Sequence, residues 1–309
     1  MGGFLFLGMK YKKEPLSIVE QVALLTDRGL SCQPERLATF LRQVNYYRLT
    51  GYLYAYRKSD IDDNFIDGTT FSMVEDRYYF DRELRLLIFD ALERIEISVF
   101  RSHLVEFFSS KYGAFGFLER NSFRQDEIEN FHEDFLKFSE VTKERSSSDF
   151  VKAYRSKYTS ESHLPCWMLF EEMTFGALSK FYANLHQVDR EVLSRHYGLT
   201  RKVFGSWLHM LAVVRNICAH HGRLWNRHFP IGFQIPKEKN LSDFHKPVKI
   251  TTASNRVFPS LVVIQYLLNV IDVDNTWGSQ LKALVSHYPE LPMEQIGFPE
   301  NWMEVPFWR

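Results

Sequence analysis

The helical spacing of apolar residues between positions 80 and 108 constrains the fold more than any other feature of the chain. Apolar side chains recur there every three or four positions, which is the spacing of one buried face of an α-helix. They are Leu84, Leu87, Ile88, Ala91, Leu92, Ile95 and Val99. The segment therefore predicts a long amphipathic helix in the main body of the protein.

Two shorter helices are predicted near the N-terminus. Over residues 16–30, Ser17 is a candidate N-cap and Gly29 a candidate stop. Pro34 suits the first turn of a second helix over residues 34–44, because its missing N–H has no partner to lose there.

The tyrosine-rich segment 45–57 leaves two alternatives open. Its rings form a packing seam, the interpretation we prefer, or they offer bases a stacking surface together with Arg48 and Arg57. With the two short helices, this segment forms an expected N-terminal helical subdomain over residues 1–70. Residues 71–309 form the expected helical body.

Two parts of that body are expected to depart from simple helix packing. Charged and serine residues near 121–160 predict an insertion of helices joined by an exposed loop. Three prolines predict an irregular or strand-containing excursion near 229–255, followed by helices near 255–271 and 276–288. Strand is expected only in that excursion and around residues 58–72, so the predicted fold is all-α.

Composition indicates a packed globular protein, since 45% of the residues are hydrophobic and 27 are Phe. The chain has no apolar run long enough to span a bilayer, and basic residues follow rather than precede the short apolar stretch in residues 1–13. We therefore expect a cytoplasmic protein without a membrane partner. Its three cysteines lie far apart in sequence, which favours buried thiols over disulfides or a Cys-x-x-Cys metal site.

The formal net charge is zero, but the charges are unevenly distributed. Residues 195–250 carry ten basic and two acidic side chains, a local net charge of +8. An anionic partner is therefore expected at this part of the chain, and RNA binding there is expected to be electrostatic.

The basic block surrounds the segment 203–227, which carries the most informative pattern. An apolar helical stripe contains Phe204, Leu208 and Leu211, and Arg215 continues the same stripe. A guanidinium in that position is costly to bury alone, so it needs either a carboxylate partner or a bound anion.

A second face of this helix carries His209, Asn216 and His220. The small residues Gly205, Ser206 and Ala212 border it, which would let another helix or a phosphate backbone approach. Arg215 and His220 are separated by about 140° on a straight helix. Their joint action requires the arginine to curl around the helix, the helix to end near Gly222, or a second subunit to contribute.

The run RNICAHHGRLWNR at 215–227 resembles the Arg-x4–6-His motif of HEPN ribonucleases, and it is similar in more detail to the Abi-like branch of bacterial abortive-infection proteins. Four other segments resemble that family in the same order along the chain. They are NYYRLTGY (45–52), ERIEISVFRSHL (93–104), LPCWMLFEEMTFGALSKFY (164–182) and GFPENW (297–302).

This resemblance implies a HEPN-type helical bundle, a homodimer that brings two motifs together, and metal-independent cleavage of RNA in phage defence. Arg215 and His220 are then the catalytic pair, with Asn216 as a supporting residue. The matching residues His221, Arg223, Asn226 and Arg227 are candidate RNA-binding residues. No cofactor, metal or DNA is expected, and the RNA partner is a target RNA or a structured noncoding RNA.

Each of these residues also has a structural alternative. His220 would interact favourably with a helix C-terminus, and Arg215 would pair with Glu93 or Glu96 in the core. The run of Cys218, His220 and His221 lacks the usual ligand spacing of a zinc site. At the level of function, the alternatives are an RNA-binding regulator or toxin–antitoxin component that holds a noncoding RNA with weak or conditional cleavage, and a module that binds only other proteins.

Overall fold

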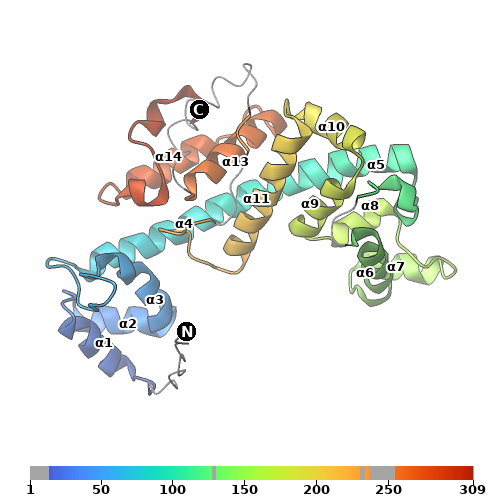
Figure 1. Ribbon diagram of the computed structural model, residues 1–309. Coiled ribbons are helices and arrows are strands. Elements are labelled where there is room, and N and C mark those ends of the chain that lie inside the picture. The colour runs from blue at the N-terminus through green and yellow to red at the C-terminus, as the bar shows by residue number, and fades with distance from the viewer. Residues whose placement is uncertain (1–13, 127–129, 230–233, 237–254, 309) are drawn as a thin grey trace, which may run out of the picture. The chain divides into compact units, whose positions relative to one another are not determined.

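The computed structural model describes residues 14–126, 130–229, 234–236 and 255–308 (Figure 1). Helices and their connections make up these ranges, in which β-pairing is confined to isolated bridges. The all-α class is therefore confirmed. Around residues 58–72, the predicted strand is present only as single-residue bridges, Arg57 with Phe65 and Ser31 with Thr70. Most of the predicted 229–255 excursion lies outside the described residues.

The chain divides into two compact units, Met1–Tyr79 and Phe80–Arg309. The first unit contains three α-helices, a 3₁₀ turn and the first turns of a longer helix. These are α1 (Ile18–Asp27), α2 (Pro34–Val44), α3 (Tyr46–Leu53), the turn Tyr54–Tyr56 and the start of α4 (Phe71–Glu96).

Local sequence features explain where the first helices begin and end. Ser17 and Glu20 form a reciprocal capping box at the start of α1. Gly29 has a φ of 98° just beyond its end, and Pro34 opens α2. The predicted helices over 16–30 and 34–44 are confirmed.

The tyrosine-rich segment contributes partly to packing. Tyr52 is buried and meets Tyr78 edge to face at 5.6 Å, which supports the packing seam. Tyr47 is 87% exposed and Tyr54 is 51% exposed, so these two rings lie outside that seam.

The predicted amphipathic helix is longer than the pattern that predicted it. In chain order it comprises α4, a π-helical stretch (Ile97–Leu104) and α5 (Val105–Tyr112). Six of the seven predicted core residues are buried, and Leu87 is half-buried. Arg101 in the π-helical stretch donates to the carbonyl oxygens of Phe170 at 2.7 Å and Met173 at 3.2 Å.

The remainder of the second unit is built from α-helices joined by short 3₁₀ turns. The α-helices are α6 (Phe131–Arg145), α7 (Asp149–Lys157), α8 (Cys166–Leu169), α9 (Phe175–Asn184), α10 (Gln187–His196), α11 (Arg201–Ala219), α13 (Phe258–Ile271) and α14 (Trp277–His287). The 3₁₀ turns are Gly116–Leu118, Arg120–Ser122, Phe170–Glu172, Met293–Ile296, Trp302–Glu304 and Pro306–Trp308. The helices predicted for the 121–160 insertion and near 255–271 and 276–288 are thus present.

Helix α11 holds a central place in this unit, since α9, α10 and α13 all pack against it (Figure 1). Its inner face is continuous core, with Trp207, Leu208, Leu211 and Val214 fully buried. In the described part of the chain, no helix is both long enough and apolar enough to cross a bilayer.

Candidate active site

The candidate active site lies at the C-terminal end of α11. The helix starts after the N-cap Thr200. At its end, His221 N–H donates to the Cys218 carbonyl at 3.0 Å, and Gly222 N–H donates to the Ile217 carbonyl at 2.7 Å. This is the Schellman arrangement, which satisfies carbonyls at a helix end. The chain reverses direction there.

The helix ends near Gly222, which was one of the three alternatives that the sequence left open. His221, with a φ of 54°, takes the left-handed position that glycine usually occupies. Gly222 instead allows a close approach, because a Cβ there would lie 3.0 Å from Ile217 Cγ2 and 3.1 Å from the Ile217 carbonyl oxygen.

Arg215 is half-buried rather than enclosed in the apolar core, which corrects the expectation from the stripe. Its guanidinium carbon lies 6.0 Å from the ring centroid of Phe89 on α4, and Phe89 is itself 41% exposed. The arginine therefore rests at the edge of the core, where its long stem is covered and its charged end reaches solvent.

A core ion pair for Arg215 is absent among the described residues. Glu96 accepts instead from Arg101 at 2.6 Å, and Arg215 forms no ion pair or hydrogen bond with another described side chain. The guanidinium is therefore available to an external anion.

His220 and Asn216 are exposed, and His220 is the C-cap of α11. Within the described chain, no hydrogen bond or ring contact joins His220 to Arg215. The two side chains leave the helix about 140° apart, so a single α11 presents them on different faces.

The turn after α11 gives the candidate RNA-binding residues different surroundings. Asn226 has a φ of 50°, a conformation that asparagine tolerates well, and Arg227 N–H donates to the Leu224 carbonyl at 3.1 Å. Asn226 therefore has a structural reason to be asparagine. His221 and Arg227 are exposed, and Arg223 is half-buried.

A buried carboxylate that sequence reasoning missed fixes this turn. Asp81 on α4 is fully buried, and its Oδ1 accepts from the backbone N–H groups of Leu224 at 3.0 Å and Trp225 at 2.6 Å. Its Oδ2 pairs with Arg85, which also donates to the Gly222 carbonyl at 3.4 Å. The only sequence indication was an Asp and an Arg four positions apart on the apolar side of a helix.

A further guanidinium, that of Arg256, was also missed as a site residue. Burial and the nearby charge of Arg223 both lower the pKa of Arg256. Its Nη1 is buried and has no hydrogen-bond partner among the described residues. An anion near these two like charges would be stabilised by both.

Cys218 is not part of the reactive surface. Burial raises the pKa of its thiol to about 12, with the nearby Arg85 opposing the shift and Asp81 adding to it. The thiol is therefore protonated at neutral pH and faces the core, whereas His220 and His221 are exposed. These three residues do not share the face that a zinc site would require.

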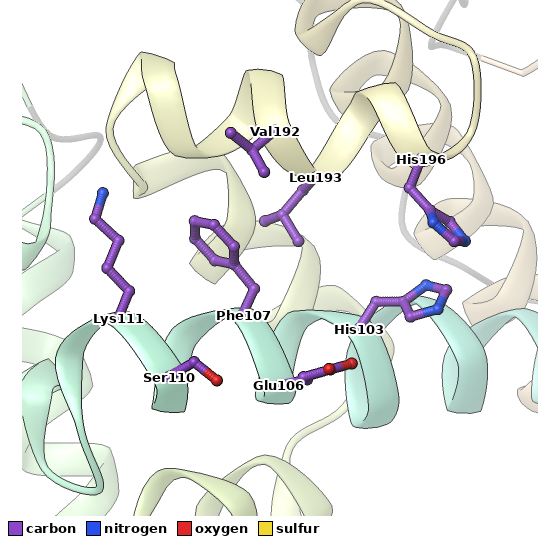
Figure 2. A pocket seen from close by; sticks show the side chains of 8 residues that line it. All are labelled: His103, Glu106, Phe107, Ser110, Lys111, Val192, Leu193 and His196. Carbon is purple, nitrogen blue, oxygen red and sulfur yellow. The ribbon is translucent and has the colours of Figure 1, made fainter.

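A separate cavity of about 580 Å³ lies between α10 and the continuous helix formed by the π-helical stretch and α5 (Figure 2). The rings of His103 and His196 lie next to each other at one end of it, with centroids 4.1 Å apart. His103 Nδ1 also forms a hydrogen bond of 2.6 Å with the Tyr197 hydroxyl. Phe107 and Leu193 form its apolar wall.

The paired histidines predict that the second unit loses stability in mild acid. Burial and the neighbouring His196 lower the pKa of His103, while Glu106 opposes the shift. The folded state therefore binds fewer protons than the unfolded state below the ordinary histidine pKa of about 6.5, so stability falls as the pH falls through that value. We expect a lower urea midpoint at pH 5.5 than at pH 7.5.

His103→Gln should reduce that difference between the two pH values, because it removes the titrating ring. His163 has a pKa that burial also lowers, so His163→Gln serves as the comparison for a second buried histidine. An equal pH dependence in wild type and both variants would contradict the assignment.

The C-terminal end of α11 and the turn after it thus combine an exposed imidazole with several guanidinium groups. An imidazole can transfer a proton near neutral pH, and guanidinium groups bind and stabilise phosphate oxygens. This combination suits reactions at a phosphodiester.

Comparison with models of protein families gives a match. A sequence profile described as Abi-like protein matches residues 39–226, which include α4, α11 and the motif through Asn226. No curated protein and no solved structure is significantly similar to the chain.

Proposed function

Because the chain belongs to the Abi-like protein family, we propose that it is a metal-independent endoribonuclease of the HEPN type that acts in abortive infection. Family membership associates the chain with this form of phage defence. Nuclease activity goes beyond family membership, and the C-terminal end of α11 supports it.

One observation carries the proposal: an exposed imidazole lies on the same helix end as a guanidinium that lacks a carboxylate partner among the described residues. His220 provides the imidazole, and Arg215 provides the guanidinium. Structural arginines of a packed domain are normally paired with acids, so this arrangement favours a phosphate ligand.

The reaction follows from the chemistry of these groups. A neutral imidazole of His220 accepts the proton of a ribose 2′-OH, and the 2′-oxygen attacks the adjacent phosphorus. The P–O5′ bond breaks, and the 5′-oxygen takes up a proton from a protonated imidazole. Arg215 binds the non-bridging oxygens as charge develops. The products are a 2′,3′-cyclic phosphate and a 5′-OH end.

We further propose that two copies of the chain share the cleft. A twofold contact between two α11 helices would bring the His220 face of each subunit beside Arg215 of the other. Arg215 and His220 could then act together across the two subunits, although they lie about 140° apart on one helix.

The decisive experiment incubates the purified protein with single-stranded RNA, with and without EDTA, and analyses the product ends. We expect cleavage that EDTA does not reduce and 3′ fragments that begin with 5′-OH. Loss of activity in EDTA that returns with a metal ion would contradict the mechanism.

An RNA-binding regulator is the second candidate, and the cluster of Arg223 and Arg256 favours it as much as it favours a nuclease. The same experiment separates the two functions. Tight binding that leaves RNA intact would support the regulator, whereas neither binding nor cleavage would support a module that binds only proteins.

A further inference from the structure

We propose that a cavity beside the N-terminal half of α11 takes in one unpaired base of the RNA that is cut at His220, an inference that rests on the proposed ribonuclease function. The cavity has a volume of about 470 Å³ and lies between α6, α9 and α11. It would determine which base is accepted at a fixed distance from the cut.

The cavity wall suits a flat aromatic ligand. Three phenyl rings from α6 line one side, and Phe131 and Phe138 among them are only half-buried. Small residues, including Ala177, Ala183 and Gly205, also line the cavity. Aromatic side chains bind unpaired bases by stacking, and the small residues leave a slot for the ring.

Polar groups at the cavity favour a base over an apolar helix from a protein partner. Ser179 is buried and His209 is exposed, and neither side chain hydrogen-bonds to another described residue. The exposed residues Lys180 and Asp134 add one charge of each sign at the rim. A base edge carries both donors and acceptors, whereas an apolar helix would leave such groups unpaired.

The cavity and the candidate active site share one face of α11. Gly205, His209, Asn216 and His220 fall within about 60° of one another around the helix. Along the helix, His209 and His220 are about 16 Å apart at about 1.5 Å per residue. That span corresponds to at most about five nucleotides at a stacked spacing of about 3.4 Å.

Gly205 provides the most direct test of the cavity. A Cβ at this position would lie 3.5 Å from Tyr182 Cε1, which is an ordinary contact, so the packing of the protein does not require glycine there. Alanine is the better helix former. A side chain much larger than alanine would instead extend into the cavity that Gly205 lines.

The experiment compares Gly205→Leu with Gly205→Ala in the full chain. Wild type should cleave a randomised single-stranded RNA with a base preference at one position within about five nucleotides of the cut. Leucine should fill the slot and reduce that preference by about 5- to 150-fold, the equivalent of one stacked base. Alanine, the matched control, should retain most of it.

His209→Ala is the second variant, because an exposed side chain can be removed without disturbing the core. It should weaken the preference while Gly205 and the aromatic wall remain. If Gly205→Leu does not fold, as judged by circular dichroism, the His209→Ala variant tests the cavity in its place.

Several results would overturn the inference. The first is a wild-type protein that cleaves RNA without a base preference near the cut. The second is a folded Gly205→Leu protein with an unchanged base preference. The third is a Gly205→Leu protein that differs from wild type only in its oligomeric mass. The last result would assign the cavity to a protein partner.

If wild type does not cleave RNA, the proposed function fails and binding alone tests the cavity. Fluorescence anisotropy with a short single-stranded oligonucleotide then compares wild type with Gly205→Leu. Weaker binding by the variant supports the base pocket, and equal or absent binding overturns it.

Discussion

Replacing His220 with alanine is expected to lower the rate of RNA cleavage by about 10²- to 10⁴-fold, the usual contribution of a general acid or base. The side chain is exposed, and its structural part in the helix end is played by backbone groups, so the variant should fold as wild type does. Cleavage is measured on a short RNA under single-turnover conditions. His228→Ala, an exposed histidine just beyond the motif, is the control and should retain full activity.

Replacing Arg215 should also lower the rate of RNA cleavage, in this case through the loss of phosphate binding. Arg215→Lys keeps the charge and loses the forked pair of donors, so it separates charge from geometry.

A mixture of Arg215→Ala and His220→Ala chains should regain activity if two subunits share the cleft, since a heterodimer restores one intact half-site. Wild-type activity in the His220→Ala protein would contradict the proposed mechanism. Full activity in a strictly monomeric wild type would contradict the shared cleft.

Local features of the sequence were sufficient to predict most of the helices. The spacing from Leu84 to Val99 predicted the long helix because an amphipathic face repeats every 3.6 residues regardless of what covers it. Ser17 and Pro34 predicted helix starts because their effects act within one turn.

The environment of the candidate residues could not be predicted in the same way. Arg215 belongs to an apolar stripe, yet it is half-buried because the ring that its guanidinium approaches, Phe89, is itself 41% exposed. Periodicity identifies which residues share a face, but it does not show how far the neighbouring helix extends over that face. The π-helical stretch Ile97–Leu104 was missed for a related reason, since its apolar pattern is compatible with an ordinary helix.

Contacts between distant parts of the chain were beyond sequence reasoning altogether. Asp81 and Trp225 are 144 positions apart and share a hydrogen bond. Arg223 and Arg256 come from segments before and after the predicted excursion and lie close enough for their charges to interact. A single sequence records neither pairing, because each depends on how the helices pack.

The second large effect is expected from Asp81→Ala, which should reduce the free energy of unfolding by about 3–5 kcal/mol. The substitution leaves the buried Arg85 without its carboxylate and removes the acceptor of two backbone N–H groups after α11. The unfolding free energy is obtained from urea titrations monitored by circular dichroism. Asp90→Ala, an exposed aspartate on the same helix, should change it by less than about 0.5 kcal/mol.

Asp81→Asn separates the role of the charge from that of the acceptor. Asparagine keeps an oxygen for Leu224 and Trp225 but cannot neutralise Arg85, so the turn can form while the ion pair is lost. We expect an intermediate loss of stability and a reduced rate of RNA cleavage under conditions where the protein remains folded, because this turn carries Arg223 and follows His220. Asp81 variants with the same free energy of unfolding as wild type would contradict the role of Asp81 in anchoring this turn. Normal cleavage by a folded but destabilised Asp81→Asn protein would restrict Asp81 to stability alone.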